Sequence, residues 1–330
     1  MKVLTWNMLA TSFSILPLLA CSCTRALAVP QQIVDPDFRI SIESPGYPNG
    51  GPTVAIDEAH SNFHTAVGQY KPFADLLAAD GYRIIRQTGK FEAKALAKID
   101  VLVIANPRNV NALMAGDLSK SALTEHECHV VRDWVRNGGS LLLIADHAPF
   151  GVAAEKLGQH FGITMGKKWV FDRASTDRIT TELDFSNDNG LLGKHPILFG
   201  RSSAEEVKHI RSFTGQSLSG PRGAIPLIKL SATSREALTP DDLRAEDAAL
   251  HGASISPFGA HSGVVANRTQ GLAMKFGKGK VVALGEAGMF SAQIVQYADG
   301  RKEKFGLNTP NHDDHQFALN TLHWLSGLLH

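Results

Sequence analysis

Histidine and carboxylate side chains collect next to several predicted strands and before the last helix of this sequence. Imidazole and carboxylate groups together suit zinc or another divalent ion, and the same two groups serve general acid and base catalysis. The residue types therefore predict acid–base chemistry or a bound divalent metal such as zinc. The acid–base candidates are Asp57, Glu58, His60, Asp146, His147 and Glu286, and the candidate metal ligands are His60, His64, His147 and His312.

Spacing alone leaves a structural role open for each candidate. Asp57, Glu58 and His60 also suit a helix cap or mutual neutralisation, and the acidic residues beside His312 also suit a helix N-terminus. Asp57-x-x-His60 and His60-x-x-x-His64 fit one face of a helical turn. The H-E-x-x-H metalloprotease pattern and the G-x-S-x-G nucleophile pattern are both absent from the sequence. The known sequence motifs therefore do not distinguish metal binding, acid–base catalysis and helix capping for these residues.

Alternating strand and helix patterns must position these side chains. Short apolar runs predict four strands, at residues 52–57, 82–86, 100–105 and 140–145. Between the last two, Thr124 and Glu127 form a capping-box pattern before a helix that Gly138-Gly139 ends. This alternation predicts an α/β fold with a doubly wound, mostly parallel sheet, which binds ligands at the carboxyl ends of its strands.

The second half of the chain has a weaker periodicity. Residues 167–265 are rich in Ser, Gly, Pro and charge, and they predict an irregular insertion within a single α/β domain that covers residues 29–330. Beyond them, residues 271–276 and 281–285 predict two strands joined by a tight turn. Apolar spacing over residues 317–328 then predicts a last helix that packs on the sheet.

Charge and cysteine content exclude several classes of partner and site. The chain of 330 residues has 33 Lys and Arg against 32 Asp and Glu, so its net charge of +1 provides no field to hold a nucleic acid. Its three cysteines, Cys21, Cys23 and Cys128, allow neither a disulfide framework nor a cysteine zinc site. We expect a small polar or carbohydrate ligand instead.

Residues 1–28 have the pattern of an export signal. A basic start and a short apolar run lead into Leu18-Leu-Ala-Cys21, which resembles a bacterial lipobox with Cys21 as the lipidated residue. Ala26-Leu-Ala28 is a rival cleavage site that would release a soluble product, and an uncleaved segment is a third interpretation. The first two predict export from a bacterial cytoplasm, to the periplasm or as an outer-membrane lipoprotein. A lipid at Cys21 would then be the one attachment to a membrane.

The chain resembles the class I glutamine-amidotransferase-like superfamily over about residues 29–165 and 266–330. It is most similar to extracytoplasmic branches with trehalose-utilisation-like and gliding-motility transport-associated domains. The segments that carry the resemblance are 56–60 (IDEAH), 100–107 (DVLVIANP), 138–147 (GGSLLLIADH), 277–286 (GKGKVVALGE) and 316–325 (QFALNTLHWL). The resemblance implies a flavodoxin-like sheet. It also implies a cysteine nucleophile on the turn after a central strand, where this chain has Ala145-Asp-His-Ala-Pro149.

Two functions follow as expectations. The missing cysteine makes thiol-dependent glutamine hydrolysis unexpected, and Cys128 falls within a predicted helix as a small buried residue. The polar strand ends predict an exported hydrolase-like enzyme that acts on a small polar substrate, such as a carbohydrate derivative. The missing nucleophile favours the alternative, a noncatalytic cell-envelope lipoprotein that binds a glycan or a protein partner.

Overall fold

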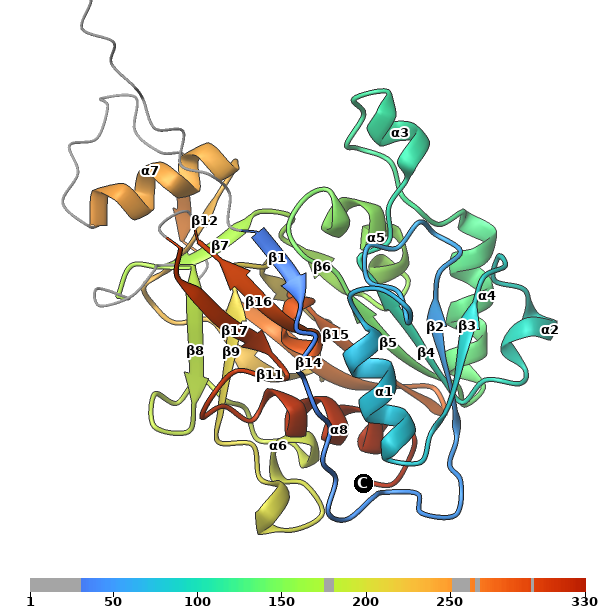
Figure 1. The fold of residues 1–330 in the computed structure, drawn as a ribbon. Helices are drawn as coiled ribbons and strands as arrows, with labels where there is room; N and C mark the ends of the chain where they lie inside the picture. Colours follow the sequence, from blue (N-terminus) through green and yellow to red (C-terminus); the bar gives the residue numbers. More distant parts are fainter. Residues whose placement is uncertain (1–30, 175–180, 251–261, 265–267, 298–299) are drawn as a thin grey trace, which may run out of the picture.

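A nine-stranded mixed sheet lies at the centre of the structure, a computed structural model that describes residues 31–174, 181–250, 262–264, 268–297 and 300–330 (Figure 1). Five neighbouring strands are parallel, in the order β3 (Arg83–Gln87), β2 (Thr53–Asp57), β4 (Val101–Ala105), β5 (Ser140–Ile144) and β15 (Gly279–Leu284). The other four pair antiparallel: β14 (Thr269–Phe276), β10 (Leu218–Ser219), β6 (Thr164–Met165) and β11 (Ile225–Lys229). The α/β class is confirmed, but the parallel pattern ends at β15.

The parallel strands form because their side chains are apolar on both faces. Every residue of β2, β4 and β5 is buried. Along β4, Val101 and Val103 enter one hydrophobic core, and Leu102 and Ile104 enter a second core on the opposite face. A strand that is covered on both faces lacks the polar alternation of a half-exposed strand, and the apolar runs predicted this burial.

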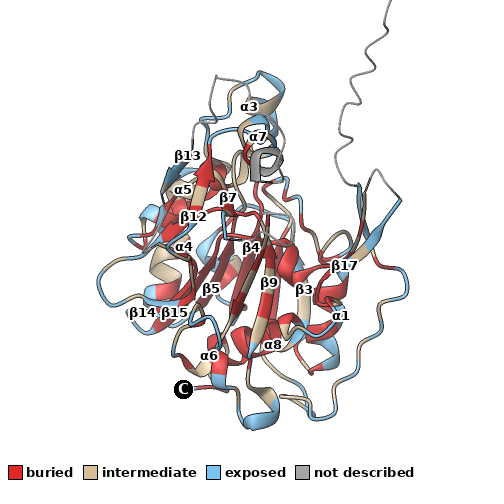
Figure 2. Ribbon diagram, turned by 90° about the vertical axis from the view of Figure 1, so that its left-hand side faces the viewer, coloured by how far each residue is buried: buried red, intermediate tan, exposed pale blue. Residues whose placement is uncertain are grey.

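Helices cover both faces of the sheet (Figures 1 and 2). One core includes residues of α1 (Lys71–Ala79) and α8 (Asp314–Leu325), and the other includes residues of α2 (Ala93–Leu96), α4 (Glu125–Arg136) and α5 (Phe150–Gln159). The predicted capping box is present at α4, where Thr124 accepts from the Glu127 N–H and Glu127 accepts from the Thr124 N–H. Gly138 follows the helix with a φ of 125°, which favours glycine and ends the helix there.

Residues 167–265 are more regular than the sequence predicts. Their elements are β7 (Trp169–Asp172), β8 (Glu182–Ser186), α6 (Pro196–Phe199), η1 (Ser203–Glu205), β9 (His209–Phe213), β10, β11, β12 (Ser234–Ala237), α7 (Pro240–Leu250) and β13 (Ser262–Val264). The strands are short, and β8 and β9 bury only alternate residues, which makes them look polar in sequence. Phe185 and Ile210 enter the same core as α1 and α8, so the segment packs against the sheet.

Three further strands form a separate antiparallel sheet, β1 (Gln31–Val34), β16 (Ala292–Gln296) and β17 (Lys302–Gly306). The short helix η2 (Gly288–Phe290) leads from β15 into this sheet. The predicted export signal at 1–28 lies outside the described residues. Within the described ranges, no helix has both the length and the apolar character that a bilayer crossing needs.

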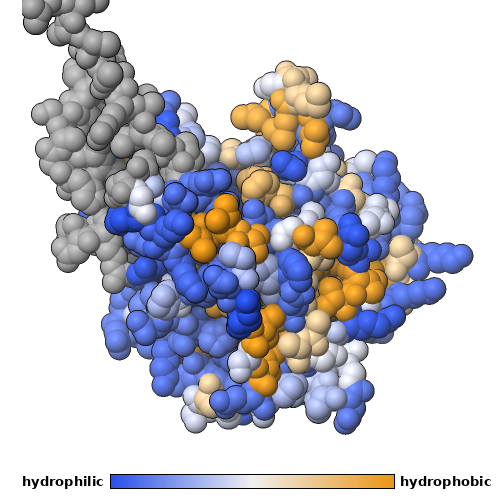
Figure 3. Space-filling view, in the orientation of Figure 1, coloured by the Kyte–Doolittle hydropathy of each residue, from blue (hydrophilic) through white to orange (hydrophobic). Residues whose placement is uncertain are grey.

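The segment between β4 and α4 projects from the carboxyl edge of the parallel strands. It contains the short helix α3 (Val110–Met114) (Figure 1). Its Met114 is 84% exposed and Leu118 is 54% exposed, and Figure 3 shows apolar surface at this projection. The edge where the candidate residues gather is therefore bordered by an arm with an exposed apolar tip.

Candidate functional site

Asp146 and Glu286 lie at the ends of the adjacent parallel strands β5 and β15. Asn106, directly after β4, holds Asp146 in place. Its side-chain amide donates to Asp146 Oδ2 at 2.6 Å, and its Oδ1 accepts from the Asp146 N–H at 2.8 Å. Asp146 Oδ1 also accepts from the N–H of Ala287, the residue after Glu286, at 2.9 Å. Three strand ends are thereby joined around one carboxyl group, as the carboxyl-end rule predicts for an α/β site.

The two carboxyl groups have unusual environments. Asp146 is half-buried, and burial raises its pKa above the ordinary value although Asn106 and Ala287 stabilise the carboxylate. Glu286 is buried and accepts N–H bonds from Gly288 at 2.6 Å and Met289 at 2.8 Å. Burial, and then the negative charge of Asp146, raise the pKa of Glu286 well above its usual range. Burial and the neighbouring negative charge both favour the protonated form of Glu286, which therefore keeps its proton at a pH where an isolated carboxyl would be ionised.

His64 and Tyr70 form the buried side of this group. Asn106 donates its second amide hydrogen to His64 Nδ1 at 3.2 Å, so the proton of the neutral imidazole is on Nε2. Burial lowers the pKa of His64 to about 3, which keeps the ring neutral. The Tyr70 hydroxyl donates to the Ala287 carbonyl at 2.9 Å. His64 is therefore a neutral hydrogen-bonding residue beside the carboxyl pair.

Two aromatic pairs include residues that follow Asp146 or precede His64 in the chain. The His147 ring stacks on Trp169 with ring centres 4.4 Å apart and planes 21° apart, and both residues are half-buried. Phe63, which precedes His64, lies 6.0 Å from the ring of Phe150. His147 Nδ1 contacts the Ala148 carbonyl at 3.0 Å, so it donates there and its Nε2 carries the lone pair when the ring is neutral. Aromatic side chains are thus present in the segments around Asp146 and His64.

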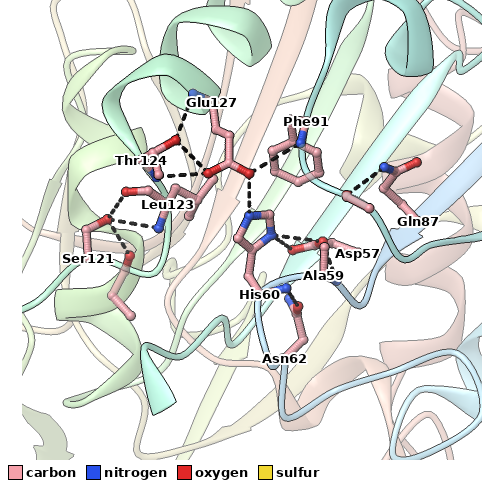
Figure 4. Close-up of polar contacts among 12 residues, drawn as sticks. Asp57, Ala59, His60, Asn62, Gln87, Phe91, Ser121, Leu123, Thr124 and Glu127 are labelled. Atoms are coloured by element: carbon pink, nitrogen blue, oxygen red, sulfur yellow. Dashed lines mark hydrogen bonds and ion pairs between the residues drawn. The ribbon is translucent and has the colours of Figure 1, made fainter. Parts of the chain in front are cut away.

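His60 lies apart from these residues, between two carboxylates (Figure 4). Its Nδ1 is 2.8 Å from Asp57 Oδ2 and its Nε2 is 3.0 Å from Glu127 Oε1. All three side chains are buried, and the ring packs on Phe91 with centres 4.7 Å apart. The group joins the end of β2 to the first turn of α4. Both ring nitrogens of His60 are engaged, which leaves neither open to an ion.

Hydrogen bonding decides the charges of this second group. Burial opposes a charged His60, but the contacts with Asp57 and then Glu127 outweigh it and raise the pKa of the imidazole. Burial also opposes ionised Glu127, but the bonds from Thr124 and then His60 lower its pKa to about 2. Glu127 thus caps α4 and pairs with His60 through different oxygens. An imidazolium between two carboxylates is a stable ionic link and a poor general base.

A cavity of about 230 Å³ opens beside His60. Its polar lining comes from the loops after β2, β3 and β4 and from the start of α4, and includes Ser61, Lys90, Arg108, Asn109, Asn111 and Thr124. Glu58 turns to other partners: it pairs with Arg86 at 2.6 Å and accepts the Ala66 N–H at 3.0 Å. Lys90 and Arg108 are the cationic residues of its lining, whereas the charge of His60 is offset by Asp57 and by Glu127, which also lines the cavity.

The four histidines predicted as metal ligands occupy four different surroundings. His60 lies with Asp57 and Glu127, His64 with Asn106, and His147 with Trp169. His312 lies with Asp184 and His209 instead. Within the described ranges, His60, His64 and His147 belong to no group of three converging ligand atoms. The predicted carboxyl-edge set is thus divided into separate groups.

Sequence reasoning missed several contributors to these groups. Asn106 stands out in the sequence only as part of a polar segment after a strand, and its φ of 46° is a conformation that Asn tolerates better than most residues. Glu127 has the sequence signature of a cap, but its second contact with His60 has no local signal. Cys128 is buried, and burial raises the pKa of its thiol to about 12, which excludes a reactive thiolate.

Comparison with known proteins supports the fold. No family model and no curated protein matches the chain. Among solved structures, the mmIFT52 N-terminal domain has a TM-score of 0.54 at 14% identity, over 83% of this chain and 96% of that one. A thuA-like protein from Bacteroides uniformis has a TM-score of 0.41 at 11% identity, over 87% of this chain and 94% of its own. A Thermoplasma acidophilum protein whose name describes it as part of GMP synthase has a TM-score of 0.39 at 9% identity, over 84% of this chain and 95% of its own.

These likenesses extend to the fold alone. The mmIFT52 domain shares the α/β architecture of this chain. At these identities, activity has to be argued from the site.

Proposed function

We propose that the protein is an exported hydrolase-like enzyme of an extracytoplasmic branch of the glutamine-amidotransferase-like superfamily. The observation that carries the enzymatic proposal is the interacting pair of Asp146 and Glu286, which the Ala287 N–H joins at the ends of adjacent parallel strands. Two neighbouring carboxyls that differ in exposure and have raised pKa values are suited to general acid–base work at a higher pH than an ordinary carboxyl. The sequence places both at the position where this fold binds ligands.

Asp146 and Glu286 have different proposed roles because they differ in solvent exposure. Asp146 is half-buried and is the carboxyl that a substrate can reach, so it exchanges a proton with the attacking water and the leaving group. Glu286 is buried, and in its neutral form it lets Asp146 ionise without a second negative charge beside it. Asn106 positions Asp146 through two hydrogen bonds.

The surroundings favour a small polar substrate with a flat face, such as a carbohydrate derivative. His147, which follows Asp146 in the chain, stacks on Trp169, and Phe63 and Phe150 form a second aromatic pair. Sites that combine apolar rings with a few fixed polar groups bind such ligands in many proteins. The cysteine route of amidotransferases is excluded from this proposal because the turn at Asp146 and His147 has no thiol.

A hydrolase substrate panel tests the proposal. Chromogenic glycosides, esters and amides are offered to the parent and to Asp146→Asn, with Asp75→Asn as matched control because Asp75 is an exposed carboxylate on α1 that pairs with Lys71. We expect turnover by the parent, at least about 100-fold less with Asp146→Asn, and no change with Asp75→Asn. Absence of turnover across the panel, or equal turnover by parent and Asp146→Asn, would contradict the enzymatic role.

The cavity beside His60 favours a second candidate function, binding without turnover. Lys90, Arg108, Asn109 and Asn111 line it, so an acidic glycan would find two cations and two amide groups there. Calorimetric titration with charged and neutral oligosaccharides separates the two functions. Saturable binding that Arg108→Ala weakens and Asp146→Asn leaves unchanged, with turnover absent, would favour this candidate.

A further inference from the structure

Asp184, His209 and His312 bring two imidazoles and one carboxylate together on the side of the molecule formed by β8, β9 and the start of α8. Their three ligand atoms all lie within 4.8 Å of one another. His209 Nε2 is 3.7 Å from Asp184 Oδ1, and His312 Nε2 is 3.4 Å from the same oxygen. Ligand atoms bound tetrahedrally to zinc at about 2.0–2.1 Å are about 3.3–3.5 Å apart. The side chains therefore approach the spacing of a zinc site.

Backbone contacts place the two histidines. The Asp313 N–H donates to the His209 carbonyl at 2.7 Å, and Asp313 Oδ2 accepts from the His209 N–H at 3.0 Å. The start of β9 is thereby fixed to the start of α8, and the two rings lie 3.9 Å apart. Asn311, with a φ of 59°, forms the turn that presents His312. The two histidines thus come from two segments, distant in the sequence, that Asp313 and His209 hold together.

The tautomer of His312 favours a ligand at Nε2. Its Nδ1 contacts the Pro310 carbonyl at 2.7 Å, and because a carbonyl only accepts, Nδ1 carries the proton. In the neutral ring Nε2 then has the lone pair, and it faces a carboxylate oxygen at 3.4 Å. Two acceptors in contact need a proton or a cation between them. A hydrogen bond from the second ring nitrogen to a carbonyl is the usual support of a metal-bound histidine.

Arg211 is the competing cation. Its Nε and Nη2 bind Asp184 Oδ1 and Oδ2 at 2.7 and 3.1 Å, while its Nη1 also pairs with Glu182 at 3.3 Å. Each carboxylate oxygen has two lone-pair positions, so Oδ1 can accept from the guanidinium and ligate an ion as well. Arg211 orients the Asp184 carboxylate and offsets part of its negative charge. This weakens the attraction of the carboxylate for a metal ion but leaves a lone pair on Oδ1 for coordination. All three ligands are half-buried, so one or more coordination positions remain open to water or another small ligand.

We propose that Asp184, His209 and His312 bind one divalent transition-metal ion of the zinc class. This site is separate from the Asp146 and Glu286 pair and does not depend on the enzymatic proposal. A set of two imidazoles and one carboxylate suits zinc and its neighbours, whereas magnesium and calcium prefer oxygen ligands.

Zinc titration of the chelator-treated full chain tests the site. A second group of the same composition, Glu125, His129 and His160, lies on the surface of α4 and α5 and supplies the matched control. We expect one equivalent of zinc to bind, with affinity reduced at least about 100-fold in His209→Ala and in His312→Ala and unchanged in His129→Ala. Magnesium should not compete. Thermal unfolding of each metal-free variant checks that the fold is retained. The visible absorption spectrum of cobalt bound to the parent tests for the metal site without any substitution.

Three outcomes would overturn the proposal. The first is the absence of zinc and cobalt binding by the parent. The second is unchanged zinc affinity in both folded variants, His209→Ala and His312→Ala. The third is loss of the bound equivalent in His129→Ala, which would place the ion at the surface group.

Discussion

Asn106 and Asp146 are joined by a reciprocal pair of hydrogen bonds, from the Asn106 amide to Asp146 Oδ2 at 2.6 Å and from the Asp146 N–H to Asn106 Oδ1 at 2.8 Å. The pair connects the ends of β4 and β5, which are neighbours in the parallel half of the sheet. A carboxyl that is fixed at both its backbone and its side chain keeps one orientation toward a substrate. The proposed acid–base role of Asp146 depends on this restraint.

Removal of the Asn106 side chain should loosen Asp146 and raise its pKa further, because a donor to the carboxylate is lost. Asn106→Gly is the better variant, since glycine accepts the φ of 46° without strain, and Asn106→Ala adds about 1 kcal/mol of backbone strain. NMR titration of the Asp146 carboxyl measures the pKa, and chemical denaturation measures the free energy of unfolding. An unchanged Asp146 pKa in Asn106→Gly would show that the amide does not stabilise the carboxylate.

His60 should contribute stability in a defined pH range. Its pKa is raised in the folded chain, so the contribution is complete below the unfolded value of about 6.5 and is lost as pH rises through the folded value. His60→Gln leaves two buried carboxylates facing a neutral amide and should cost about 3 kcal/mol near pH 6. Urea unfolding of parent and variant at pH 6 and pH 9.5 compares the two. A difference in unfolding free energy that is no smaller at pH 9.5 would contradict the imidazolium assignment.

Thr124 should act on both the start of α4 and the charge of Glu127. Thr124→Ala removes the cap and the hydroxyl that donates to Glu127 Oε2 at 2.7 Å, at a cost of about 1–2 kcal/mol. It should also raise the pKa of Glu127 from about 2 toward the ordinary value. Thr124→Ser keeps the hydroxyl and serves as control. Equal unfolding free energies for the Ala and Ser variants would show that the capping bond contributes nothing.

Strong local signals allowed the parallel half of the fold to be predicted. The apolar runs that became β2, β4 and β5 are buried on both faces, and Thr124 with Glu127 marked the start of α4 correctly. The hairpin of β14 and β15 was also predicted, but the other antiparallel strands, which lie mostly in residues 167–265, were not foreseen because they are short. Glu182–Ser186 and His209–Phe213 alternate between buried and half-exposed residues over only five positions each, too few for a firm pattern.

The site was predictable in part for a related reason. Asp146 and Glu286 follow apolar strands directly, so the carboxyl-end rule selects them. Asn106 also follows a strand directly, but its amide does not titrate, so it was not selected as an acid–base candidate. His312 was grouped with His60 by composition, whereas its actual neighbours Asp184 and His209 come from the segment in which no element was expected. Contacts between distant segments depend on strand register, which composition does not specify.

The pH dependence of kcat/KM, measured from about pH 3 to pH 9 on the best substrate of the panel, tests the central claim most directly. Burial raises the pKa of Asp146 and of Glu286, so the limb of the profile that reports the pair should lie above the range of an ordinary carboxyl, about 4. Asp146→Asn should abolish that limb and lower kcat/KM at least about 100-fold, while Asp75→Asn retains it. A profile of the same shape and height in Asp146→Asn as in the parent would contradict the claim that this carboxyl pair carries the chemistry.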